Sequence, residues 1–267
     1  MLLALAVVAS VASADSPFDP GSGKDASGSA DDPTLLPGFG QWSGDLPAGD
    51  VDWYGVDTTG APACAMLTTN ATAGHDVTLG VRGAAPHSIR GIAPPGTPVR
   101  IALAAPGVTR TLAGFHSATS TDLKYAFHLE RLTLDGFAGG DGDTGTDAGG
   151  LLSNAMPVKS HCFRGSVGLK DSTDVYAFTV PSPDQVVYSL AASGAASPSL
   201  RILDAAGAAL GAVVGSGGIG VVNLPSAGTY YLSVTIPLDS SASNYLVGLV
   251  GPDPPPGSPC RPYCMVS

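Results

Sequence analysis

Charged residues are scarce in this chain of 267 residues: they make up 13% of it, with 12 Lys and Arg against 22 Asp and Glu. Because helix surfaces need Glu, Lys, Gln and Arg, this scarcity argues against a helical protein. No run of Lys or Arg occurs, and the net charge is −10. A nucleic-acid partner requires a basic stripe that neutralises phosphates, so we expect no nucleic-acid partner, and anionic membrane surfaces are disfavoured for the same reason.

Catalytic motifs are also missing. The chain contains no G-x-S-x-G elbow, no H-E-x-x-H and no P-loop. His75-Asp76 could form part of a triad, but no activated serine accompanies it. A carboxylate pair of the glycosidase type stays open as an alternative, although the carboxylates cluster in loops that look metal-binding. We therefore expect a protein that is not an enzyme.

A long uncharged apolar run occurs at the N-terminus alone. Residues 1–14 read MLLALAVVASVASA and end in the A-x-A pattern of a signal-peptidase site. This run is too short for a transmembrane helix, which needs ~20 residues. We predict a signal peptide at 1–14 and a secreted or cell-surface protein without a transmembrane segment; a buried strand or short anchor is the alternative.

Cysteine is limited to four positions: Cys64, Cys162, Cys260 and Cys264. Four cysteines allow three pairings, and export favours their oxidation. We favour Cys64 with Cys162, and Cys260 with Cys264 in the Pro-rich tail. The alternative is a zinc site that includes His161, but the C-x3-C spacing is loose for zinc. Asn70 begins an N-glycosylation sequon, Asn-Ala-Thr.

Turn formers are abundant, with 36 Gly and 23 Pro, as many short strands require. Period-two alternation marks strands with one buried face, for example where Tyr176, Phe178 and Val180 alternate with smaller residues. In the first half of the chain we predict strands at Asp52–Asp57, Ala63–Thr69, Val77–Gly83, Val99–Ala104 and Lys124–Leu132. In the second half, Ala205–Val214 could be a short helix, but its flanking glycines favour a hairpin.

The chain contains an internal repeat at a spacing of about 122 residues. Five matches keep the same order: 19–27 with 141–149, 42–46 with 163–167, 52–56 with 174–178, 95–97 with 227–229, and 125–129 with 245–249. This predicts an all-β protein of two tandem jelly-roll-like antiparallel sandwiches, at 15–134 and 135–250, followed by a tail at 251–267.

In this alignment Pro98-Val99 of the first copy falls where the second copy has Tyr230-Tyr231. Proline cannot donate to a strand ladder, so we expect an edge or distorted strand there and a degenerate first copy.

Several of the repeated segments carry a family resemblance. They are Gly-Asp-Val-Asp-Trp-Tyr at 49–54, Ser-Thr-Asp-Val-Tyr-Ala-Phe at 172–178, Ala-Gly-Thr-Tyr-Tyr-Leu-Ser-Val at 227–234 and Asn-Tyr-Leu-Val at 244–247. The chain resembles, twice over, the bacterial and archaeal pre-peptidase C-terminal domains, and is similar to the collagen-binding modules of clostridial collagenases. The resemblance implies jelly-roll-like sandwiches and non-catalytic accessory roles.

Aspartate recurs in a Gly-rich loop, where Asp141, Asp143 and Asp147 occupy positions one, three and seven. Calcium takes six to eight oxygen ligands, and such a loop can wrap it; turn formation alone is the simpler explanation. The family resemblance extends the calcium set by position to Asp171 and Asp174 in the second copy. In the first copy it gives Asp19, Asp25, Asp50 and Asp52. Gly21 replaces the middle aspartate there, so we expect the first site to be weaker.

Trp53 and Tyr231 lie opposite in phase to their core-facing neighbours, so we predict that they are exposed ligand contacts. We expect a calcium-stabilised, non-catalytic binding or adhesion module whose partner is an extracellular protein or polysaccharide. The alternative function is that of a structural repeat unit of a surface layer, stalk or filament.

Overall fold

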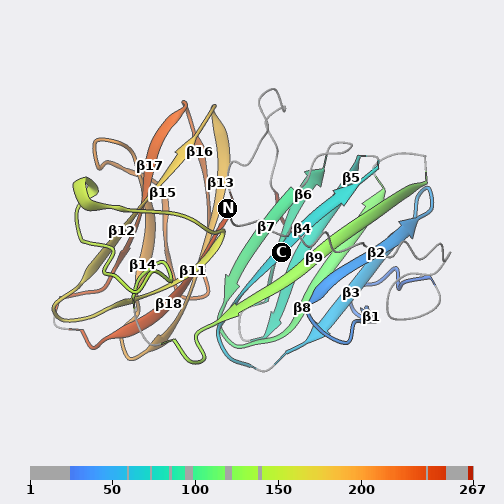
Figure 1. Cartoon of the computed structure of the whole chain (residues 1–267), viewed down its shortest axis with the longest axis horizontal. Helices are drawn as coiled ribbons and strands as arrows, with labels where there is room; N and C mark the ends of the chain where they lie inside the picture. The colour runs from blue at the N-terminus through green and yellow to red at the C-terminus, as the bar shows by residue number, and fades with distance from the viewer. Residues whose placement is uncertain are drawn as a thin grey trace, which may run out of the picture.

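The chain folds almost entirely into antiparallel strands, as described by a computed structural model (Figure 1). The description covers residues 25–250 except 59, 73, 84–85, 94–98, 118–121, 138–139 and 239, and adds the backbone of 264–266. The predicted signal peptide, Asp19 and Cys260 lie outside these residues. Within the described part, no helix is long and apolar enough to cross a membrane.

The first sandwich contains nine strands: β1 (Thr34–Leu35), β2 (Gly40–Leu46), β3 (Val51–Asp57), β4 (Ala63–Ala71), β5 (His75–Gly83), β6 (His87–Ala93), β7 (Val99–Ala105), β8 (Val108–Ser117) and β9 (Leu123–Thr133). They form one sheet of order β1-β3-β8-β5-β6 and one of order β2-β9-β4-β7. A tenth short strand, β19 (Cys264–Val266), pairs antiparallel with the free edge of β6. The five strands predicted here are confirmed, whereas β1, β2, β6 and β8 were not predicted. Glycines and charged residues interrupt the apolar pattern of β6 and β8.

The second sandwich begins with a 3-10 turn, η1 (Leu152–Asn154), and contains β10 (Met156–Pro157), β11 (Cys162–Val167), β12 (Thr173–Val180), β13 (Asp184–Gly194), β14 (Ser199–Leu203), β15 (Ala209–Gly215), β16 (Ile219–Leu224), β17 (Gly228–Thr235) and β18 (Ser243–Val250). Its sheets have the orders β10-β12-β17-β14-β15 and β11-β18-β13-β16. The predicted hairpin is confirmed, because β14 and β15 pair across a turn in which Asp204 Oδ1 accepts the amide of Ala206 at 2.9 Å.

The two sandwiches have the same strand order when each strand of the first is matched to the strand nine places later. The structure therefore shows two tandem antiparallel sandwiches. This match corrects one part of the sequence alignment. β17, which contains Tyr230-Tyr231, corresponds to β8 and not to the strand that follows Pro98, because β8 pairs with β3 as β17 pairs with β12. Thr111-Leu112 is the equivalent pair, and β7 is an edge strand of its sheet.

The two sandwiches join through their inner sheets, at a seam where β7 lies against β13 and β18 (Figure 1). Buried side chains of the second sandwich, Val187, Ala191, Leu246 and Val250, belong to the same apolar cluster as the core of the first. Strands β13 and β18 are thus buried on both faces, which explains why their apolar residues run almost without interruption.

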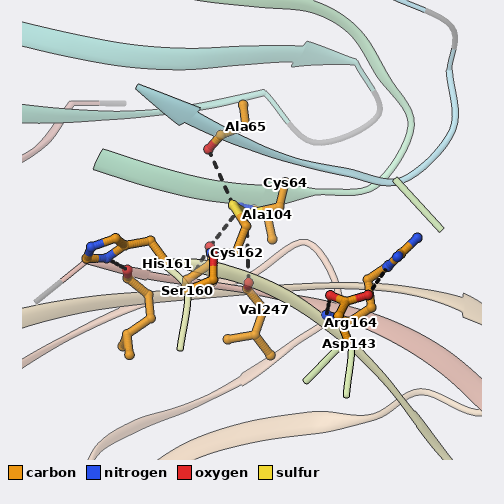
Figure 2. Close-up of a disulfide and its surroundings, with 12 residues drawn as sticks. Cys64, Ala65, Ala104, Asp143, Ser160, His161, Cys162, Arg164 and Val247 are labelled. Carbon is orange, nitrogen blue, oxygen red and sulfur yellow. Dashed lines mark hydrogen bonds and ion pairs between the residues drawn. A yellow bond between two sulfur atoms is a disulfide. The ribbon is translucent and has the colours of Figure 1, made fainter. Parts of the chain in front are cut away.

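A disulfide between Cys64 of β4 and Cys162 of β11 crosses the seam, as we predicted (Figure 2). Beside it, the Ala104 amide donates a hydrogen bond of 2.9 Å to Ser189 Oγ. The sheets approach closely because Gly248 has no side chain: a Cβ there would lie 2.6 Å from Ser189 Oγ and 2.9 Å from the Ala104 nitrogen.

We predict that Gly248→Ala lowers the free energy of unfolding by about 1–3 kcal/mol, because the added methyl overpacks the seam against backbone. Gly215→Ala is the matched control, since a Cβ at Gly215 of β15 meets nothing within 4 Å. Urea denaturation of both variants measures the difference. Equal effects of the two substitutions would contradict the tight seam.

Candidate metal centre

Both sandwiches contain the same buried hydrogen-bonded group of one aspartate and two tyrosines. The first tyrosine follows the aspartate by two residues, and the second, from the last strand of the sandwich, is hydrogen-bonded to both. In the second sandwich Tyr245 Oη donates to Asp174 Oδ2 at 2.5 Å, and the hydroxyls of Tyr245 and Tyr176 are 2.6 Å apart. In the first, Tyr125 Oη donates to Asp52 Oδ2 at 2.6 Å, and Tyr54 Oη lies 2.6 Å from Tyr125 Oη. The group fixes the orientation of both aspartates.

Four carboxylates meet beside this group in the second sandwich. Asp141, Asp147, Asp171 and Asp174 each offer one oxygen, and these oxygens lie within 4.8 Å of one another. The first two come from the loop before β10, the third from the turn between β11 and β12, and the fourth from β12 itself. The tertiary structure therefore brings together four of the five aspartates predicted for this site.

Backbone hydrogen bonds hold the loop that contributes Asp141. Its amide donates to the Thr146 carbonyl at 2.7 Å and closes the loop. Its carboxylate accepts hydrogen bonds from the backbone amides of Ser166, at 2.8 Å, and Ala148, at 3.0 Å. Asp171 is fixed similarly, because it exchanges backbone hydrogen bonds of 2.7 and 3.1 Å with Gly168. The site is thus organised by backbone before any ion binds.

Asp174 is the observation that distinguishes this cluster from a group of surface charges. Its side chain is fully buried, and its Oδ1 has no hydrogen-bond partner among the described residues. A buried carboxylate oxygen without a partner is costly and requires an explanation, such as an ion. The donor set contains oxygen only, which suits calcium and not zinc.

The electrostatics of the cluster agree with a missing positive charge. Burial raises the pKa of Asp174 to about 8, and the neighbouring carboxylates add to the shift against the opposing hydrogen bond from Tyr245. Burial, with repulsion from Asp147 and Asp141, raises the pKa of Asp171 to about 6. Burial also raises the pKa of Asp141. Without a cation, Asp174 therefore holds a proton at neutral pH.

Asp143 does not join the cluster, which corrects the loop assignment made from its spacing. Its carboxylate accepts hydrogen bonds from Arg164 Nε at 2.6 Å and from the Arg164 backbone amide at 3.2 Å (Figure 2). Its backbone has a φ of +57°, so the loop turns at this residue and directs the side chain to β11. The spacing of the aspartates correctly predicted that this loop contributes to the cluster. It did not predict which of its side chains point toward the cluster.

The first sandwich has a smaller cluster, in which Asp25, Asp50 and Asp52 each offer an oxygen within 4.8 Å of the others. These are three of the four aspartates predicted there, and the fourth, Asp19, lies outside the described residues. The expectation of a weaker site rested on Gly21 replacing the aspartate equivalent to Asp143. Because Asp143 is not in the second cluster, this reason no longer holds.

The remaining predicted residues lie on separate surfaces. Trp53 and Tyr231 are partly buried and not fully exposed, on the outer sheets of the first and second sandwich. Asn70 is exposed at the end of β4, as a glycosylation site requires. Sequence reasoning missed the roles of Tyr125 and Tyr245, although both had been recognised as a repeated position.

Comparison with known families gives one match, which lies within the second sandwich. The bacterial pre-peptidase C-terminal domain matches residues 172–236, from the turn before β12 to the end of β17. No curated protein sequence matches the chain.

Solved structures give only remote similarity. The PBSX exported protein XepA is 8% identical, with 78% of this chain and 84% of that one covered and a TM-score of 0.27. YhaK from Escherichia coli is 12% identical over 81% and 88%, with a TM-score of 0.24. The tandem CBM22-1-CBM22-2 domain of Paenibacillus barcinonensis Xyn10C is 12% identical over 79% and 85%, with a TM-score of 0.23. Scores this low carry no argument about function.

We predict that the metal-free protein becomes less stable as the pH rises from 5 to 9. The raised pKa values of Asp171 and Asp174 mean that the folded state holds protons that the unfolded state releases above about pH 4. Stability is therefore lost as the pH passes the folded values of about 6 and about 8. Melting temperatures in EDTA across this range measure the loss.

The control for this pH dependence is Asp174→Asn, which keeps the shape of the side chain and removes its titration. This variant should show a flatter pH profile than the wild type in EDTA. A wild-type melting temperature that rises or stays constant between pH 5 and 9 would contradict the assignment.

Proposed function

We propose that the protein is a secreted or cell-surface, non-catalytic binding module whose second sandwich binds calcium through Asp141, Asp147, Asp171 and Asp174. The single observation that carries the calcium proposal is the buried, unpartnered Oδ1 of Asp174 within a cluster of three further carboxylates. The cation would replace the proton that Asp174 otherwise holds. It would also tie the loop before β10 to strand β12.

The pre-peptidase C-terminal match supports an accessory and extracellular role, and the crossing disulfide fits an oxidising compartment. We extend the family proposal to the first sandwich, because it repeats the strand order and the aspartate–tyrosine group of the second. Its cluster of Asp25, Asp50 and Asp52 is then a second calcium site. The partner that we propose is an extracellular protein or a polysaccharide.

We predict that calcium raises the melting temperature at pH 7.5 and that Asp147→Asn removes most of this increase. Extracellular calcium modules bind at ~10⁻⁴–10⁻³ M, so 10 mM calcium should add about 1.4–2.7 kcal/mol to the free energy of unfolding. Asp147 suits this test because it is exposed, so its substitution leaves the core intact. Thermal melts in calcium and in EDTA measure the increase.

Asp143→Asn is the matched control, since Asp143 lies in the same loop but outside the cluster. This variant should keep the calcium response. An identical melting temperature of the wild type in calcium and in EDTA would overturn the calcium proposal, and loss of the response in both variants would show that the loop as a whole, and not the cluster, is responsible.

A structural repeat unit is the second proposed function, and one observation favours it. Strand β15 forms the edge of its sheet, is largely exposed and carries no charged residue, whereas the equivalent edge strand β6 is covered by β19. An uncharged exposed edge can pair with another chain. Light scattering over a range of concentrations tests this function: the wild type should self-associate, and Val213→Lys on β15 should prevent it.

A further inference from the structure

At one position of the outer sheet, the first sandwich carries a tryptophan where the second carries a valine. Trp53 of β3 is partly exposed and lies against Gly114 of β8, its partner across the sheet. A Cβ at Gly114 would meet three consecutive indole carbons at nearly equal distances, 2.7 Å for Cη2 and Cζ3 and 2.8 Å for Cε3. Near-equal distances mean that the indole turns a face, and not an edge, toward the strand.

The equivalent position in the second sandwich is closed. Val175 of β12 takes the place of Trp53, is 3% exposed, and lies opposite Ser233. The backbone contact is the same in both copies: the Val175 amide donates to the Gly149 carbonyl at 3.0 Å, and the Trp53 amide donates to the Ser27 carbonyl at 2.8 Å. The two copies thus share a backbone frame, and at this position only the first sandwich presents an aromatic face.

A group of three polar side chains lies beside the indole on the same face. His116 is two residues beyond Gly114 on β8, a distance of about 7 Å along the strand. It lies opposite Asp76 of β5, with His116 Nδ1 3.7 Å from Asp76 Oδ2, and Arg90 Nη2 of β6 pairs with the same oxygen. The side chains of Arg90 and His116 are 46% and 47% exposed, whereas that of Asp76 is 10% exposed. The buried carboxylate thus positions Arg90 at the surface, with His116 beside it.

We propose that this face, made by Trp53, His116, Asp76 and Arg90, binds a pyranose ring of a polysaccharide. A sugar ring combines an apolar face of C–H groups with a rim of hydroxyls, so it matches an aromatic face bordered by fixed hydrogen-bonding groups. Asp76 offsets the charge of Arg90, which favours a neutral sugar over an anionic one. This inference rests on the proposed binding function and names the class of ligand.

The alternative role of Trp53 is to shield the Gly114 backbone from solvent, as aromatic residues do across a sheet from glycine. Both roles predict lower stability for Trp53→Ala, but only the binding role predicts a change in affinity at Arg90→Gln. Arg90 does not contact Gly114 in the sheet ladder, since Thr78 lies between them. Binding, and not stability, is therefore the measurement that separates the two roles.

The test is retention of the full chain on microcrystalline cellulose, chitin and insoluble xylan in calcium-containing buffer. We expect retention on at least one of them, and a loss of affinity of about tenfold or more for Trp53→Ala and for Arg90→Gln. Arg82→Gln is the matched control, because Arg82 lies on β5 six residues from Asp76 and pairs with Asp31. This variant should bind as the wild type does. Thermal melts verify that each variant is folded.

A second measurement guards against a Trp53→Ala variant that fails to fold. The chain has two tryptophans, so Trp42→Phe leaves Trp53 as the reporter. Its emission should shift on titration with the hexasaccharide of the polymer that retains the protein. The proposal is overturned if no polymer retains the protein, if the emission does not change, or if Arg82→Gln abolishes retention while Arg90→Gln preserves it.

Failure of the ligand proposal and failure of the calcium proposal are distinguishable. Retention with no calcium effect on the melting temperature overturns the calcium site alone. A calcium response without retention on any of the three polymers overturns the sugar-binding face alone.

Discussion

The buried carboxylate of Asp174 is the constraint on which the second sandwich depends. A charge in the interior of a sandwich is tolerated only if it is hydrogen-bonded, protonated or paired with a cation. Tyr245 satisfies one oxygen, the other has no hydrogen-bond partner among the described residues, and Asp174 lies in a cluster with three further carboxylates. The loop before β10 and the turn at Gly168–Asp171 both bring carboxylates next to Asp174. The positions of these two segments therefore depend on whether a proton or a cation neutralises Asp174. The first sandwich places Asp52 under the same constraint.

The seam between the sandwiches adds a second constraint, which concerns volume and not charge. Small residues and one glycine, Gly248, let two sheets approach until backbone and side chain meet directly. The disulfide from Cys64 to Cys162 fixes the same surfaces covalently. The two candidate calcium sites and the outer sheets therefore belong to one connected body, in which the two sandwiches lie side by side (Figure 1).

Duplication has left two copies that share a frame and differ at the surface. The strand order and the aspartate–tyrosine group are common to both. The first copy, which the sequence suggested was degenerate, retains every strand of the second and carries Trp53 on its outer sheet. The comparison of Trp53 with Val175 shows where the two copies diverged, because the backbone hydrogen bond at that position is unchanged.

The sequence by itself determined the β class, the duplication and the Asp-bearing segments. These features depend on local composition, on period-two patterns and on matches in register, all of which are readable along the chain. Only the tertiary structure decided that Asp143 turns away to Arg164, that β8 and not the Pro98 segment corresponds to β17, and that β13 and β18 are buried on both faces. The physical reason is the same in each case: the side a residue faces and the strand it pairs with are set by contacts between segments distant in sequence, which no local pattern records.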